Sequence, residues 1–373
     1  MKKLFIFIRL VIFLTIMFIL IVLLGKIYTP KWKNGAASKT DGQDYTINGY
    51  YKLDKNSIDV LFLGDSSLYK SISPMEIYKD TGIASYNYSV SSARIYLLYY
   101  ILKDAYQYQK PKVIMIDPLT LFYVTREDEP VRRKSFDYMK FSKVKYEMIN
   151  DKFFDFDFKE KLSLYFPLFR YHSRWSETGP NSIKRTFGDY NSITKGYIMS
   201  TIIYPSYKGF DYMKPKNNKV VMTDYTREYL DKFVSFCKEN DIEIVFLGVP
   251  DTRVWGYNQN EKLKELVKEY DVKYLDLNND SYGIDFTTDT EDAGMHFNLN
   301  GALKITKEVT KYLKENYNFK DHRNDKEYES WNKDLVKYEK IKEKKLSELK
   351  EKIENKDYDV KKKTTTKNIK DKH

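Results

Sequence analysis

The sequence predicts an α/β protein with a parallel sheet, preceded by an apolar N-terminal segment. Short apolar runs typical of buried strands occur at 60–63, 113–116, 242–247 and 273–277. Amphipathic stretches typical of helices lie between them. Strands that alternate with helices form parallel sheets whose two faces are both covered by helices.

The first element, residues 1–25, is predicted to be a transmembrane anchor. The run 4–24 is almost wholly apolar and, at helical rise, spans about 31 Å, enough to cross a bilayer core. Lys2 and Lys3 precede it, and Arg9 can reach the same side, so the positive-inside tendency places the N-terminus in the cytoplasm and the rest of the chain outside the cell. A cleaved signal peptide is the alternative, but the run is long for a signal core and no small-residue cleavage site follows it cleanly.

Composition divides the remaining chain into a connector, a domain and a tail. Residues 26–57 lack sustained apolar periodicity and are expected to form a juxtamembrane segment. The α/β domain is expected over 58–319, and an insertion at about 120–215 interrupts its alternation of strands and helices. We expect this insertion to pack beside the sheet, on the side of the strand ends. The lysine- and glutamate-rich tail, 320–373, predicts a solvated helix followed by a disordered end.

Within the domain, helices are predicted at 95–108, 223–240, 261–270 and 301–316, in each case from apolar residues at helical spacing. The one cysteine, Cys237, falls in the second of these and is expected to be a buried small hydrophobe. A single cysteine excludes an internal disulfide framework and any metal site built from cysteines.

The chain carries 64 Lys and Arg against 53 Asp and Glu, a formal net charge of +11. Basic proteins often bind nucleic acid, but a domain outside the cell does not meet it, so we expect no nucleic-acid partner. The anionic partners there are lipid headgroups and cell-wall polymers such as teichoic acids. The alternative is that much of the excess charge lies in the tail and keeps it soluble.

The chemistry centres on the end of the first predicted strand, where Gly64, Asp65 and Ser66 follow the apolar run 60–63. A serine at the carboxyl end of a buried strand presents its hydroxyl at the edge where parallel sheets gather functional residues. If a helix opens there, its first N–H groups face the site at the positive end of the helix and can stabilise an oxyanion. Ser67 is the competing nucleophile, or a helix cap.

The second group of residues lies in the loop before the last predicted helix. His296 is there, Asp292 is four positions earlier, and Asp289 and Glu291 are neighbouring acids that could replace Asp292. A serine nucleophile needs a base within hydrogen-bond reach and a third group that orients the base. Of the 4 histidines, His172 is the rival base. Such chemistry needs no metal and no organic cofactor.

The two segments resemble the SGNH/GDSL hydrolase superfamily, and the resemblance covers about 58–315. It implies a flavodoxin-like three-layer α/β/α fold, and ester hydrolysis or acyl transfer with Ser66 as nucleophile, His296 as base and Asp292 as acid. The family's aspartate and histidine are usually three positions apart, whereas here they are four apart.

Two further family blocks supply oxyanion donors, and this chain departs from both. The second block usually offers a glycine N–H; here the matching stretch, 86–92, contains no glycine, and we expect the backbone N–H of Ser89 to serve beside that of Ser66. The third block usually supplies an asparagine; here it is Asp117, and an ionised carboxylate cannot donate. Losing one such donor costs about 2.7–4 kcal/mol of barrier, which favours a slow, specialised site.

The anchor, exterior domain and insertion together resemble accessory proteins of cell-surface acylation, such as alginate O-acetyltransferase components and the D-alanyl transfer protein of teichoic acid modification. This resemblance implies an acyl donor delivered by a multi-spanning membrane acyltransferase, and a surface polysaccharide or teichoic acid as acceptor. His172, Arg174 and Trp175 lie where that group carries an aromatic and basic motif, so they and Asp117 are candidate substrate-binding residues. A packed structural cluster is the alternative for the first three.

The sequence therefore supports two hypotheses from different classes. One is a membrane-anchored serine O-acyltransferase or esterase that works through an acyl-serine. The other is a catalytically inactive scaffold of the same fold that holds anionic cell-wall polymer. A secreted lipase-like esterase is a third hypothesis, and it predicts turnover of soluble aryl esters.

Overall fold

A computed structural model of the chain describes residues 1–31, 42–188, 191–217 and 219–358. Its centre is a five-stranded parallel sheet in the order β2-β1-β3-β4-β5. The strands are β1 (Val60–Leu63), β2 (Ser85–Asn87), β3 (Val113–Ile116), β4 (Glu243–Gly248) and β5 (Lys273–Asp276). This is the flavodoxin-like strand order, so the α/β class with a parallel sheet is confirmed. The three residues of β2 are too few to give an apolar pattern, and the sequence analysis did not predict this strand.

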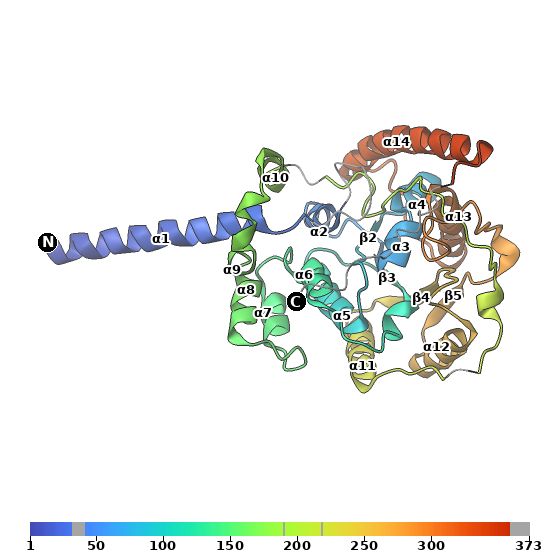
Figure 1. Cartoon of the computed structure of the whole chain (residues 1–373), viewed down its shortest axis with the longest axis horizontal. Coiled ribbons are helices and arrows are strands. Elements are labelled where there is room, and N and C mark those ends of the chain that lie inside the picture. The colour runs from blue at the N-terminus through green and yellow to red at the C-terminus, as the bar shows by residue number, and fades with distance from the viewer. Residues whose placement is uncertain (32–41, 189–190, 218, 359–373) are drawn as a thin grey trace, which may run out of the picture.

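Helices cover both faces of the sheet, as Figure 1 shows. On one face lie α5 (Ile95–Ala105), α11 (Asp224–Glu239) and α12 (Tyr257–Tyr270). On the other lie α3 (Ser66–Ser71), α4 (Pro74–Thr81) and α13 (Leu299–Asn316). Cys237 is buried in α11, as predicted. All four residues of β1 and of β3 are buried, which is why their sequences are continuous apolar runs instead of alternating ones.

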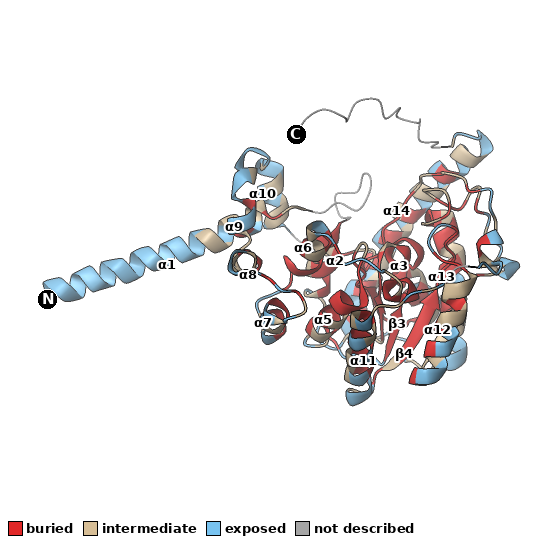
Figure 2. Ribbon diagram, turned by 60° about the horizontal axis from the view of Figure 1, so that its bottom comes forward, coloured by how far each residue is buried: buried red, intermediate tan, exposed pale blue. Residues whose placement is uncertain are grey.

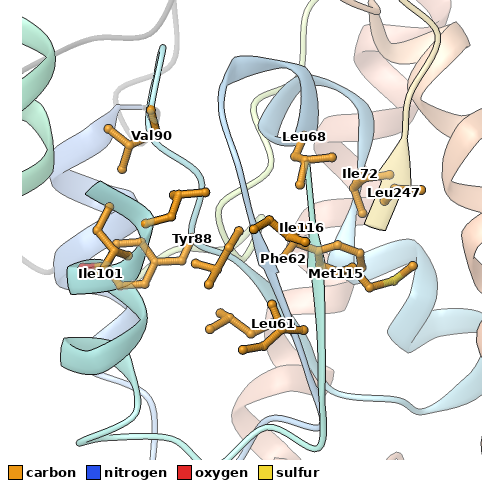
Figure 3. Close-up of a cluster of buried hydrophobic side chains, with 14 of the residues drawn as sticks. Leu61, Phe62, Leu68, Ile72, Tyr88, Val90, Ile101, Met115, Ile116 and Leu247 are labelled. Carbon is orange, nitrogen blue, oxygen red and sulfur yellow. The ribbon is translucent and has the colours of Figure 1, made fainter. Parts of the chain in front are cut away.

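The core follows the sheet and reaches into the helices on both sides (Figure 2). Figure 3 shows one part of it, where Leu61 and Phe62 of β1 pack near Met115 and Ile116 of β3. Each such side chain contributes about 1.5–3 kcal/mol by leaving water. The core holds the carboxyl ends of β1 and β3 at a fixed separation, and the candidate site lies there.

The N-terminal helix α1 (Lys2–Tyr28) projects from the domain and is exposed over most of its length (Figures 1 and 2). It has a mean hydropathy of 3.1 over its most apolar 18 residues and is long enough to cross a membrane. Near its end it meets the domain at Gly25, where an added Cβ would lie 3.2 Å from the backbone nitrogen of Leu168. A side chain there would require the neighbouring backbone to shift by a few tenths of an ångström.

Part of the segment predicted as juxtamembrane belongs to the domain. Helix α2 (Gln43–Tyr50) packs against it, and Ile47 and Tyr50 are fully buried. The hydroxyl of Tyr86 donates to the carbonyl of Thr46 at 2.8 Å. The packed core therefore begins near residue 43 and not near 58. The apolar side chains of this segment are spread among polar residues, so the sequence showed no periodic pattern.

The insertion divides into a group of short helices and a stretch that returns past the strand ends. Its helices are α6 (Glu129–Phe136), α7 (Lys143–Asn150), α8 (Phe158–Tyr165), α9 (Leu168–Tyr171) and α10 (Pro180–Thr186). Of these, α9 and α10 lie beside the end of α1, whereas α6 and α7 pack against α5 (Figure 1). The stretch 196–206 returns past the strand ends, where the N–H groups of Ile198 and Tyr204 donate to the carbonyls of Tyr69 and Thr290 at 2.8 and 2.9 Å. Among the described residues of the insertion, this returning part lies beside the candidate site, as does Tyr123 near the start of the insertion.

The tail begins with a docked helix. Helix α14 (Glu329–Glu354) forms an additional layer over α4 and α13 (Figure 1), and its Trp331, Tyr338 and Leu349 are buried. The sequence predicted a solvated helix, but these apolar residues recur on one face and reach the core. The predicted disordered end lies outside the described residues.

Candidate active site

Ser66 is the first residue of α3, directly after the turn that ends β1. Asp65 caps the helix, because its Oδ1 accepts the N–H of Ser67 at 2.7 Å. Gly64 is required for close approach: a Cβ there would lie 2.5 Å from Cβ of Asp117 and 2.8 Å from Cδ1 of Leu68. The turn therefore leaves the Ser66 hydroxyl partly exposed at the carboxyl edge of the sheet.

The imidazole of His296 lies between Ser66 and Asp292. Its Nε2 is 2.8 Å from Oγ of Ser66, and its Nδ1 is 2.5 Å from Oδ2 of Asp292. The two contacts form one hydrogen-bonded chain from carboxylate through imidazole to hydroxyl, across 230 positions of sequence. This is the relation that a serine nucleophile, its base and the orienting acid require.

The backbone of the 292–296 loop accommodates the four-residue spacing. Ala293 and Gly294 both adopt left-handed conformations, with φ of 66° and 96°. The other carboxylate oxygen of Asp292 accepts the N–H groups of Met295 and His296, at 3.2 and 2.8 Å. The loop thus folds back on Asp292. The four-position spacing, one longer than is usual in the resembling family, still leaves the Asp292 carboxylate within hydrogen-bond distance of the His296 ring.

The two neighbouring acids have other partners. Asp289 is fully buried and accepts from Lys304 at 2.7 Å and from Asn300 at 3.0 Å. Glu291 forms an ion pair with Lys70 of α3 at 3.0 Å, and both side chains are largely buried. Asp292 is therefore the acid that contacts His296, while the Glu291 pair joins the histidine loop to the helix that carries Ser66.

The loop after β4 also positions the histidine loop. The N–H of Thr252 donates to the carbonyl of Gly294 at 2.8 Å, and the guanidinium of Arg253 donates to the carbonyl of Asp292 at 3.2 Å. A Cβ on Gly294 would lie 2.2 Å from Oγ1 of Thr252, so glycine is needed there for space as well as for its positive φ.

The charges around His296 favour its protonated form. Burial lowers the pKa of the ring, but the hydrogen bond and charge of Asp292 outweigh burial, and the pKa is raised above 6.5. Burial alone would raise the pKa of Asp292, yet its bond to His296 holds that pKa below 3.8. The pair thus stabilises the imidazolium that would form when Ser66 gives up its proton.

Beneath Ser66 lies a buried pair of carboxyl groups, Asp65 and Asp117, which Ser67 bridges. Oγ of Ser67 is 2.5 Å from Oδ1 of Asp65 and 2.9 Å from Oδ2 of Asp117. The hydroxyl of Tyr123 donates to the other oxygen of Asp65 at 2.7 Å. A hydroxyl has one hydrogen, so Ser67 can donate to only one of the two carboxyl groups, and the other contact requires a proton on a carboxyl oxygen.

Burial and the charge of Asp65 raise the pKa of Asp117 well above 3.8, which favours Asp117 as the group that holds this proton. The sequence predicts an ionised Asp117, whereas the raised pKa favours a protonated carboxyl, which has a donor just as an asparagine side chain has. The hydrogen bonds of Asp117 go to Ser67 and to the N–H of Leu119, at 2.9 Å each. They place it behind the nucleophile, 3% exposed, rather than on a substrate-facing surface.

Ser89 does not face Ser66. The N–H groups of Tyr88 and Val90 donate to the carbonyl of Phe62 in β1 and to that of Gly64 just after it, at 2.9 and 3.0 Å. Residues 88–90 thus continue the alternation of β2 beyond its end, and in such an extended segment the intervening N–H points the opposite way. The carbonyl of Ser89 accepts from Gln43 of α2, and the residue is 1% exposed. The choice of Ser89 as oxyanion donor is therefore corrected, because the backbone alternation of residues 88–90 turns its N–H away from Ser66.

The next turn contains a residue that the sequence analysis missed. The N–H of Ala93 donates to the carbonyl of Val90 at 3.0 Å and closes a four-residue turn whose third residue, Ser92, has φ of 56°. A positive φ at this position is typical of glycine. Ser91 and Ser92 are partly exposed, and the hydroxyl of Tyr69 interacts with both Ser91 and Ser66. Ser92 thus has the backbone conformation expected of the second-block glycine, although no residue type in the sequence marks it.

The aromatic and basic cluster lies elsewhere. His172, Arg174 and Trp175 are in a short 3-10 helix, His172–Ser176, that packs against α1. Arg174 donates to the carbonyl of Tyr28 at 2.6 Å, at the carboxyl end of α1, where a cation is favoured. The ring of His172 contacts the carbonyl of Phe169. No hydrogen bond or ion pair between described residues joins this cluster to Ser66.

Comparison with known proteins adds little to this geometry. No family model matches the chain, and no curated protein matches it in sequence. Among solved structures it is similar to a "putative acylhydrolase" from Bacteroides fragilis, with 12% identity, a TM-score of 0.34, and coverage of 75% of this chain and 99% of that one. A likeness at this level carries no conclusion about chemistry.

The described residues include no group of three or more His, Cys, Asp or Glu side chains that could hold a metal. What the site does contain is a hydroxyl, a base and an acid in hydrogen-bond contact at the carboxyl edge of the sheet. This arrangement can remove a proton from a serine as it attacks a carbonyl and return that proton to a leaving group.

Proposed function

We propose that the chain is a membrane-anchored serine acyl enzyme that works through an acyl-Ser66 intermediate. The observation that carries the proposal is the hydrogen-bonded chain from Asp292 through His296 to Ser66. Oγ of Ser66 attacks the carbonyl carbon of an acyl donor while its proton passes to Nε2 of His296. His296 then gives that proton to the departing group, and Asp292 holds the ring and the positive charge that it carries between the two transfers.

A hydroxyl acceptor completes the cycle by the same proton path in reverse. His296 takes the acceptor's proton, the acceptor oxygen attacks the acyl-serine, and Ser66 recovers a hydrogen as it leaves. Attack by a sugar or polyol hydroxyl gives O-acyl transfer, and attack by water gives hydrolysis. The exterior location predicted from α1 and the resemblance to surface-acylation proteins support a surface polysaccharide or teichoic acid as acceptor, with the acyl group delivered by a multi-spanning membrane acyltransferase.

The oxyanion of the tetrahedral intermediate would be received by the backbone N–H of Ser66 and by the 90–93 turn, with Ser92 in the glycine-like position. If so, Ser92→Gly retains or increases the rate of Ser66 acylation, because glycine accepts positive φ without strain. Ser92→Val should lose it, because a β-branched residue disfavours that φ and reorients the turn. Equal rates of Ser66 acylation in the two variants would show that the turn does not contribute to the oxyanion site.

Covalent labelling tests the proposal directly. A fluorophosphonate probe should form one adduct, on Ser66, located by peptide mass spectrometry of the folded chain. Ser66→Ala and His296→Ala should abolish it, whereas Ser235→Ala, which removes an exposed hydroxyl on α11, should not. A folded wild-type chain with no adduct on Ser66 would contradict the enzyme and favour the scaffold that binds anionic wall polymer.

A further inference from the structure

A large cavity lies at the junction of α1 and the insertion, on the membrane-proximal side of the domain. Its volume is about 750 Å³, within the range of small-molecule sites. Phe18, Val22 and Lys26 line it from α1, and their spacing of four residues places them on one face of that helix. Phe166, just after α8, closes part of the opposite side, and its ring meets the ring of Phe18 at 6.0 Å, nearly edge-on. The transmembrane candidate is thus itself a wall of the cavity.

The interior is largely apolar, and its charged residues are mostly cationic. Lys26, Lys31, Lys140 and Lys145 line the cavity, against one carboxylate, Asp137. Asp137 is already held by Arg133 at 3.2 Å and by the hydroxyl of Tyr171 at 2.7 Å. None of the four lysines forms an ion pair with any described carboxylate, and Lys145 is 4% exposed, with its ammonium donating to two backbone carbonyls.

The surface around the cavity is also suited to a bilayer. Trp175 is 70% exposed and Phe169 is 48% exposed, both in elements that pack against α1. Exposed aromatic residues beside the end of an apolar helix are typical of the membrane interface.

The ammonium of Lys31 donates to the carbonyl of Lys26 at 2.7 Å, and that of Lys140 lies 4.5 Å from the centre of the Tyr51 ring, so neither cation has a described carboxylate as its ion-pair partner. A lysine without such a counter-charge is stabilised by an anionic group, and an apolar cavity is stabilised by hydrocarbon. The two requirements together describe an amphiphile.

We infer that this cavity binds one anionic phospholipid of the bilayer around α1, with an acyl chain against Phe18, Val22 and Phe166 and its phosphate near Lys31 and Lys140. The inference rests on α1 lying in a membrane and is independent of the proposed catalysis. Such a lipid would fix α1 against the domain and so set the orientation of the domain on the membrane surface.

The test uses the full chain in nanodiscs of equal parts phosphatidylglycerol and phosphatidylcholine, released for native mass spectrometry. We expect a bound phosphatidylglycerol in preference to phosphatidylcholine. Lys31→Gln with Lys140→Gln should weaken that binding about thirtyfold, taking the usual effect of two lysines near an anionic surface. The matched control, Lys268→Gln with Lys307→Gln, removes two exposed lysines on α12 and α13 and should leave it unchanged.

A steric pair of variants separates the cavity from lipid that merely surrounds α1. Val22→Trp fills the cavity and should displace the lipid, whereas Leu23→Trp, on an exposed face of the same helix, should not. Equal retention of both lipids by the wild type, or equal loss in the two tryptophan variants, would overturn the inference. Because the lysine variants change polar side chains at the cavity rim, they report on binding even if a tryptophan variant fails to fold. Labelling of Ser66 would be unaffected by either outcome.

Discussion

At the level of single residues, the most informative difference from the resembling family is Asp117, which stands where that family has asparagine. The two side chains have almost the same shape, and a protonated carboxyl shares with an amide one donor and one acceptor. Burial beside Asp65 raises the pKa of Asp117 and favours its protonated form, so the chemistry of the position is nearer to asparagine than the sequence indicates. Folding at neutral pH therefore includes the uptake of a proton by Asp117, which lowers the stability of the fold as pH rises.

Asp117→Asn should therefore stabilise the fold at neutral and alkaline pH. The folded pKa of Asp117 is raised above 3.8, so above that pH the native state binds a proton that the unfolded state does not, and stability falls as pH rises. One such proton gives a slope of about 1.4 kcal/mol per pH unit until the folded pKa is passed. Urea unfolding at several pH values should show this slope in the wild type and a shallower dependence in the variant. A variant that is less stable at every pH would contradict the protonated state.

The rate of Ser66 labelling should rise with pH through an apparent pKa above 6.5. His296 acts as base only when neutral, and Asp292 raises its pKa, so the base form is lost as pH falls through that raised value. Asp292→Asn should reduce labelling about 10⁴-fold, because the ring loses its orienting acid. Stopped-flow labelling between pH 5 and 9 measures both effects. A pH-independent rate would show that His296 is not the base.

At the level of elements, helix α14 is fixed to the domain by a buried ion pair. Lys195, directly before the returning part of the insertion, donates to Asp334 of α14 at 2.7 Å, and each side chain is 3% exposed. The ammonium of Lys195 also lies over the ring of Trp331, 4.8 Å from its centre. The same stretch of chain continues to Tyr204, which is hydrogen-bonded to the histidine loop. One segment therefore contacts both α14 and the loop that carries His296.

Asp334→Leu should destabilise the chain by about 3–5 kcal/mol, because it leaves the ammonium of Lys195 buried without its partner. Combining it with Lys195→Met should recover most of that loss, since two apolar residues can replace a buried pair. Glu343→Ala, at an exposed position on α14, should change stability by less than about 0.5 kcal/mol. Urea unfolding of the detergent-solubilised chain gives these differences. A double variant as unstable as the single one would show that packing, and not charge, fixes α14.

At the scale of the whole molecule, α1 and the candidate site lie at different parts of the domain, and the insertion helices lie between α1 and the sheet (Figure 1). An acyl donor embedded in the membrane would therefore have to present its group above the bilayer surface, which fits a separate membrane protein that passes the acyl group outward. The domain would then act as the soluble half of a two-component system.

The orientation that this requires can be tested with single cysteines. Cys237 is buried and burial raises the pKa of its thiol, so the native chain should not react with a membrane-impermeant maleimide. Lys268→Cys, at an exposed site on α12, should be labelled in intact cells, and Lys3→Cys only after permeabilisation. The reverse pattern would place the domain in the cytoplasm and would exclude a wall polymer as acceptor.

The sequence by itself determined the parallel α/β sheet, the apolar N-terminal helix and the choice of Ser66, His296 and Asp292 as candidates. These follow from local patterns: continuous apolar runs, an apolar stretch of membrane length, and reactive residue types next to strand and helix ends. Tertiary structure decided the rest. It placed Ser66 and His296 2.8 Å apart, gave Asp289 and Glu291 other partners, turned Ser89 away and put Ser92 in a glycine-like conformation. Burial raised the pKa of Asp117. The physical reason is that hydrogen-bond reach, backbone direction and desolvation depend on neighbours in space, which a pattern along the chain does not contain.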